Sequence, residues 1–177
     1  MARFYMSQTT QIRLDVIRYL AGFFDADGSV CIVTTNPRKG TNKKAVYEMR
    51  LCVSQLTEHV AVLELFKTCF GGSICSQASV KGRRPMSVWN CQSKAAVIAL
   101  QEMFPYLIVK HRAAFLSLAY QRWKNQVRED RIANRIRLVP PNELKVGAAF
   151  HRAVSYFNGK HRTQGVAPSA MEALAEA

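Results

Sequence analysis

Two sets of hydrophobic positions, each at helical spacing, run through residues 12–25 of the chain. A helix with apolar side chains on two faces needs two packing partners. A β-branched run follows directly after Gly28, which predicts that this helix leads into a strand. The two sets are Leu14, Ile17, Ala21 and Phe24, and Val16, Leu20 and Phe23.

The remaining pattern alternates between short β-type runs and helical runs, with turn-forming residues between them. The predicted order is α-β-β-α-β-β-α with an additional C-terminal helix, and antiparallel strands with helices on one side make an α+β domain. We expect one domain over residues 1–158 and a flexible tail over residues 159–177. The strands are predicted at 30–35, 45–54, 73–79 and 86–92, and the further helices at 57–70, 93–104, 110–126 and 142–157.

The second face of this sheet is predicted to be open, and alternate residues of each strand point to it. A sheet can enter the major groove of DNA, where Arg and Gln read base edges while flanking Lys or Arg bind phosphate. An ordinary solvated face explains basic turns about equally well. The predicted DNA-facing strand residues are Cys31, Val33, Thr35, Glu48, Arg50, Cys52, Ser73, Cys75, Gln77, Ser87 and Trp89, and the turn residues are Arg38, Lys39, Lys43, Lys44, Lys81, Arg83 and Arg84.

The charge balance favours a polyanionic partner. Lys and Arg number 25 against 12 acidic residues, which gives a formal net charge of +13. We expect double-stranded DNA rather than a membrane, because no apolar run approaches the roughly 20 residues that a spanning helix requires. At 177 residues and 49% hydrophobic content, the chain is long enough for one well-buried core.

The cysteines indicate a reducing compartment. The five cysteines form no C-x-x-C pair, and the four histidines show no zinc-type clustering, so we expect the cysteines to be buried thiols. We also expect no small-molecule cofactor. The N-terminal residues lack the apolar core of a secretory signal. We expect an intracellular protein, either organellar (chloroplast or mitochondrion) or from a prokaryotic cytoplasm.

The stretch Asp25-Ala26-Asp27-Gly28 closes the first helix with two carboxylates. Acids at a helix C-terminus are unfavourable by about 0.3–1 kcal/mol each, because the helix dipole is negative there. Gly22, inside the helix, costs about 1 kcal/mol relative to Ala, which a close approach of two helices would explain. A homodimer would bring a second copy of the helix and its carboxylates to the same place, where Mg²⁺ would balance the charge.

Two simpler interpretations of this stretch are available. An EF-hand loop needs Asp or Asn at its fifth position and Glu at its twelfth, where this chain has Ser29 and Asn36, so that interpretation is rejected. A plain helix with a glycine stop explains Gly28. It leaves the two acids unexplained.

The nine residues Leu20 to Gly28, LAGFFDADG, resemble the LAGLIDADG motif of homing endonucleases and differ from it only at Phe23 and Phe24. The single copy is similar to the homodimeric branch of that family, and the predicted element order extends the likeness over residues 12–126. The resemblance implies a saddle-shaped sheet and a staggered double-strand cut in a long, pseudo-palindromic DNA target, as in intron homing. The dimer interface is then expected at Leu20, Ala21, Gly22, Phe24 and Asp25.

The resemblance also implies roles for particular residues. Asp27 would be the essential metal ligand and the Ala26 carbonyl an auxiliary one, for Mg²⁺ or another divalent ion such as Mn²⁺ or Ca²⁺. Gln55 would orient the attacking water, and Lys110 would stabilise negative charge on the phosphate. His59 stands where some relatives carry a larger basic residue. Without the motif, Gln55 would be interpreted as a surface amide and Lys110 as a solvated cation.

Two other classes of function fit part of the sequence. Proteins similar to this family also serve as RNA maturases or as non-cleaving DNA-binding proteins, which have no use for a metal-ligand carboxylate at Asp27. A ribosomal-type RNA-binding protein would explain the charge but not the motif. The sequence therefore predicts a site-specific, divalent-metal-dependent DNA endonuclease.

Overall fold

The computed structural model describes residues 8–35, 46–77, 84–135 and 141–159 of the chain. Its helices and strands follow the predicted order, and the α+β class is confirmed. No helix within these ranges is long and apolar enough to cross a membrane. The elements are α1 (Gln8–Asp27), β1 (Gly28–Thr35), β2 (Val46–Leu56), η1 (Thr57–His59), α2 (Ala61–Phe70), β3 (Ser73–Gln77), β4 (Met86–Gln92), α3 (Ser93–Met103), η2 (Phe104–Tyr106), α4 (His111–Ala133) and α5 (Pro141–Phe157).

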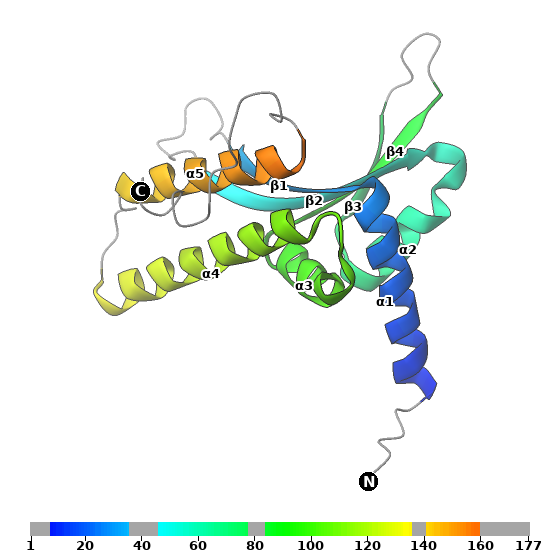
Figure 1. Cartoon of the computed structure of the whole chain (residues 1–177), viewed down its shortest axis with the longest axis horizontal. Coiled ribbons are helices and arrows are strands. Elements are labelled where there is room, and N and C mark those ends of the chain that lie inside the picture. The colour runs from blue at the N-terminus through cyan, green and yellow to red at the C-terminus, as the bar shows by residue number, and fades with distance from the viewer. Residues whose placement is uncertain (1–7, 36–45, 78–83, 136–140, 160–177) are drawn as a thin grey trace.

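The four strands form one antiparallel sheet in the order β1-β2-β4-β3. Helices α3 and α4 lie on one side of this sheet, α1 descends from its end, and α5 runs alongside β1 (Figure 1). Buried and partly exposed residues alternate along β1 and β2, as expected for strands with one face on helices. The sheet therefore has a helix-covered face and a second face that carries the more exposed side chains.

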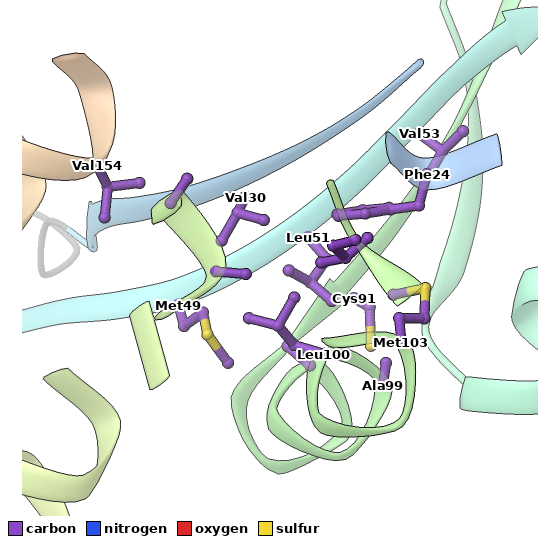
Figure 2. Close-up of a cluster of buried hydrophobic side chains, with 14 of the residues drawn as sticks. Phe24, Val30, Met49, Leu51, Val53, Cys91, Ala99, Leu100, Met103 and Val154 are labelled. Atoms are coloured by element: carbon purple, nitrogen blue, oxygen red, sulfur yellow. The ribbon is translucent and has the colours of Figure 1, made fainter. Parts of the chain in front are cut away.

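Hydrophobic side chains of the sheet and of the helices meet in one core. Figure 2 shows Leu51 of β2 beside Leu100 and Met103 of α3. Trp89 of β4 is fully buried, and its ring lies 4.9 Å from that of Phe66 in α2. Burying a large apolar side chain contributes about 1.5–3 kcal/mol, so these contacts hold α2 and α3 against the sheet.

Helix α5 protects the outer edge of β1. His151 Nδ1 is hydrogen-bonded to the carbonyl oxygen of Ile32, and Asn158 Nδ2 donates to the carbonyl oxygen of Val30 at 2.6 Å. An unpaired strand edge is a template for aggregation, and covering it with a helix is one of the ways in which proteins prevent this. The additional C-terminal helix predicted from the sequence thus completes the sheet.

Candidate functional site

The C-terminal end of α1 and the end of β2 meet at a small polar site. Asp27 is the last residue of α1, and Gly28 begins β1 immediately after it. In the β1–β2 ladder Gly28 lies opposite Val53, which brings Gln55 close to the helix end. The Gln55 amide Nε2 donates to Asp27 Oδ2 at 2.7 Å. Two residues predicted as parts of one site are therefore in direct contact.

Lys110 reaches the same helix end from the residue before α4. Its ammonium donates to the carbonyl oxygen of Asp25 and, at 3.2 Å, to that of Ala26. The last turn of α1 contains no basic residue, so Lys110 supplies the positive charge that the helix dipole favours. Burial lowers the pKa of Lys110, and the charges of Asp25 and Asp27 oppose this effect only in part.

The carboxylate of Asp25 binds the backbone of the loop before α4. Its Oδ2 accepts from the N–H groups of Ile108 at 2.9 Å and Val109 at 2.8 Å, and its Oδ1 accepts from the N–H of Lys110 at 2.8 Å. Burial raises the pKa of this carboxyl, but the hydrogen bonds outweigh burial and hold the pKa below its usual value. Both carboxylate oxygens of Asp25 are therefore engaged within its own chain.

Gly28 is needed at its position because the chain packs closely there. A Cβ on Gly28 would lie 2.4 Å from Cδ2 and 2.6 Å from the carbonyl oxygen of Phe24. Such distances require the backbone to move. The glycine that the sequence indicated as a helix stop thus also permits β1 to start directly beside α1.

Among the described residues, His59 contacts Glu58 and not Asp27, Gln55 or Lys110. It lies in η1, with Nε2 3.6 Å from Glu58 Oε1. The same oxygen of Glu58 pairs with Arg84 Nη2 at 3.0 Å. An exposed ion pair such as that of Arg84 with Glu58 contributes about 0–1 kcal/mol, so Arg84 can exchange partners.

The oxygen atoms at the end of α1 suit a hard divalent cation. Asp27 is an exposed carboxylate, and the Ala26 carbonyl already binds the ammonium of Lys110, so the position attracts positive charge. The described residues of one chain contain no cluster of three or more acidic, His or Cys side chains that could hold a metal. Asp27 and Ala26 therefore fit a part of a Mg²⁺ site, to which the described residues of this chain add no cluster of further ligands.

The second face of the sheet contains most of the predicted strand residues. The register pairs Cys31 with Arg50 and Val33 with Glu48, and the buried residues of both strands lie on the opposite face. On this face lie Cys31, Val33, Thr35, Glu48, Arg50, Cys52, Ser73, Cys75 and Gln77. The turn residues Arg38, Lys39, Lys43, Lys44, Lys81 and Arg83 lie outside the described residues, as do residues 160–177 of the predicted tail.

Ser87 and Trp89 were assigned to the wrong face of β4. Their side chains are 1% and 0% exposed. Trp89 lies opposite Val53 in the ladder, on the helix-covered face, and its Nε1 donates to the carbonyl oxygen of Gly71 at 2.8 Å. Because successive strand residues point to opposite faces, a slip of one position reverses a whole strand. The β4 residues on the second face are Met86, Val88, Asn90 and Gln92.

Arg50 and Gln92 form a cross-strand pair on the second face. They are direct neighbours in the β2–β4 ladder. With its amide oxygen turned toward Arg50, Gln92 accepts from Nε at 3.0 Å and from one terminal nitrogen at 3.2 Å. Arg50 was predicted from the sequence but Gln92 was not, because the sequence analysis placed Ser87 and Trp89 on this face of β4 instead.

The exposed face of α1 differs from the predicted interface. Leu20, Ala21 and Phe24 are fully buried in the core of their own chain, so they cannot contact a partner. Gly22 is exposed, and no atom lies within 4 Å of a Cβ placed on it. Ile12 and Tyr19 are 60% and 55% exposed and lie at helical spacing from Gly22. Both predicted apolar sets pack in the core of their own chain, since Leu20 is buried with Ala21 and Phe24, and Val16 and Phe23 are partly buried against that core.

Comparison with protein families gives one match to the core of the chain. The family model described as LAGLIDADG endonuclease matches residues 20–127, the segment that runs from the motif in α1 into α4. No curated protein sequence matches significantly.

Solved structures of homing endonucleases share the fold. The homing endonuclease I-CvuI, in complex with the I-CreI target in the presence of 2 mM Mg, is 20% identical, covers 93% of each chain and has a TM-score of 0.63. The archaeal intron-encoded homing endonuclease I-Vdi141I, complexed with DNA, is 17% identical over 94% of each chain with a TM-score of 0.54. I-GzeII in complex with its DNA target is 18% identical, covering 87% of this chain but 52% of that one, with a TM-score of 0.59.

Proposed function

Because the chain belongs to the LAGLIDADG endonuclease family, we propose that it makes a staggered double-strand break at a long, pseudo-palindromic DNA target as a homodimer. Its class is that of the family, a DNA-cleaving homing endonuclease. The observation that carries the proposal is the contact of Asp27 with Gln55 and the approach of Lys110 to the same helix end. Three side chains from distant parts of the chain meet where the motif predicts catalysis.

DNA binds on the second face of the sheet in this proposal. The face offers Arg50 and Gln92 at its centre and exposed polar residues of β3 at its edge. Arg can read guanine through two hydrogen bonds, and Gln can read adenine. The formal net charge of +13 supplies the phosphate attraction that positions the duplex.

The residues around Asp27 divide the chemistry of phosphodiester hydrolysis. A divalent ion held by the Asp27 carboxylate and the Ala26 carbonyl would neutralise phosphate charge and lower the pKa of a bound water. Gln55 is fixed by Asp27, and its remaining donor and acceptor orient the attacking water. The Lys110 ammonium stabilises the negative charge that develops on the phosphate.

A second copy of the chain completes the site. The exposed α1 residues Ile12, Tyr19 and Gly22 form an apolar stripe that a two-fold partner would cover with the same residues. This contact would bring the two Asp27 carboxylates together, so that the second copy supplies ligands in addition to those of the first.

Selection of cleaved sites from a randomised double-stranded DNA library tests the function. We expect the purified protein with Mg²⁺ to enrich one pseudo-palindromic sequence. The matched control is Asp27→Asn, which keeps the side-chain size but removes the charge and should enrich nothing. Enrichment by the Asp27→Asn variant equal to that of the native protein would refute the assignment of Asp27, and enrichment of a site without symmetry would refute the homodimer.

A further inference from the structure

We infer that Asp25 is a positioning residue that fixes Lys110 at the reaction site, an inference that rests on the proposed function. The LAGLIDADG motif contains two acids, and the structure gives them different tasks. Asp27 presents its carboxylate at the surface beside Gln55, whereas the Asp25 carboxylate turns toward the start of α4.

The bonds of Asp25 go to three consecutive backbone amides. Those of Ile108 and Val109 bind Oδ2, and that of Lys110 binds Oδ1, all at 2.8–2.9 Å. Hydrogen bonds to an ionised carboxylate are roughly twice as strong as neutral ones. Both carboxylate oxygens are thus committed to the loop, which leaves Asp25 poorly suited to coordinate a metal ion.

Lys110 is bound at both of its ends to the same short segment. Its backbone N–H binds the Asp25 side chain, while its ammonium binds the carbonyl oxygens of Asp25 and Ala26. Its own carbonyl accepts from the N–H of Ala114 at 2.9 Å, which begins α4. The backbone and the ammonium of Lys110 are therefore both bound to the Asp25–Ala26 segment. Through the backbone bond, the carboxylate of Asp25 fixes the position of the ammonium.

The surroundings of the loop make this anchor important. Ile108 and Val109 are 85% and 75% exposed, so their side chains add little packing that could hold the loop. Loss of the carboxylate would remove the bond to the Lys110 N–H and leave only the bonds of its ammonium and its carbonyl oxygen. A displacement of about 1 Å at a catalytic group can lower a rate about 100-fold.

A double-mutant cycle tests whether Asp25 acts through Lys110. The variants are Asp25→Asn, Lys110→Met and both together, with Glu64→Gln as the control, since Glu64 is an exposed acid of α2 that pairs with Lys67. We measure single-turnover cleavage of saturating target DNA and binding by fluorescence anisotropy. We expect Asp25→Asn to lower the cleavage rate about 10- to 100-fold with little change in affinity, and to have no further effect in the Lys110→Met background.

Hydrogen exchange provides a readout that does not depend on cleavage. We expect Asp25→Asn to speed exchange at the amides of Ile108, Val109 and Lys110 but not in α3, and Glu64→Gln to change neither. Should Asp25→Asn fail to fold, Asp25→Ser, which can still accept from one amide, replaces it. Multiplicative losses in the double variant, or unchanged exchange in the loop, would overturn the inference. A native protein that cuts no DNA but shows the predicted exchange would instead refute the proposed function alone.

Discussion

Substitutions at Gly22 should affect the stability of one chain and the affinity of the proposed dimer in opposite directions. Within one chain a methyl group at this position meets no atom within 4 Å. Gly22→Ala should therefore stabilise the monomer, because Ala is more favourable than Gly in a helix by about 0.8–1 kcal/mol. In the proposed dimer the two α1 helices cross at this residue, and each copy would bring an added side chain into the contact.

The size of the effect on the dimer follows from overpacking. Extra methylene groups in a packed contact cost about 1–3 kcal/mol, which corresponds to a dimer dissociation constant raised roughly 5- to 150-fold by Gly22→Ala. Gly22→Leu should separate the helices altogether, and cleavage should fall with the dimer. The two effects of the same substitution have opposite signs, a higher melting temperature for the monomer and a weaker dimer.

Sedimentation velocity over a range of concentrations measures the association, and thermal melting at low concentration measures the monomer. Gly28→Ala serves as the matched control, because its Cβ would lie 2.4 Å from Phe24 Cδ2 and should destabilise the chain itself. A Gly22→Leu protein that dimerises and cuts like the native one would refute the reasoning. So would a native protein that is an active monomer.

Further outcomes follow from the site and the sheet. Asp27→Asn should abolish cutting and change the affinity for target DNA by no more than a few-fold. Chelation of divalent ions should have the same effects without lowering the melting temperature. An Asp27→Asn variant that still nicks at the native rate contradicts the assignment of Asp27 as the metal ligand. Arg50→Ala should relax base preference at one position in each half-site, which corresponds to about 1–3 kcal/mol of discrimination. Gln92→Ala should relax the same position, and a cleavage assay of all single-base target variants measures both effects. An equal loss at every position would make Arg50 a phosphate contact. Trp89→Ala should cost about 3–5 kcal/mol of unfolding free energy in denaturant titration without changing base preference, and an altered preference with native stability would contradict its burial.

The order of elements and the contact of Asp27 with Gln55 were predictable because both follow from local patterns. Helical and β-type periodicities depend on residues close in sequence, and the motif places Asp27 at a helix end whatever packs around it. The contact with Gln55 follows from the hairpin between β1 and β2, which the sequence indicated.

The face of β4 could not be obtained in this way. The strand reads MSVWNCQ, and it has apolar residues at both phases of its alternation. It lies between β2 and β3, so Val88 is 7% exposed on one face while Trp89 is 0% exposed on the other. Periodicity cannot choose between two apolar phases, and only the register with β2 does.

Helix α1 raised a different difficulty. Two apolar sets were visible, and the core of the same chain takes residues of both, Leu20 from one and Ala21 and Phe24 from the other. The exposed apolar residues, Ile12 and Tyr19, belong to neither set. The proposed interface therefore moves around the helix, with Gly22 common to both versions.

The two acids at the C-terminal end of α1 are balanced by a residue that no local sequence pattern indicates. From the sequence, the missing positive charge was assigned to a metal ion, yet Lys110 provides one from 85 residues along the chain, through its bonds to Asp25. An ammonium on the helix carbonyls offsets the helix dipole within one chain. The Asp27 carboxylate stays exposed beside Gln55, where the proposed metal ion would bind. In this proposal the motif needs both acids because each has a separate partner.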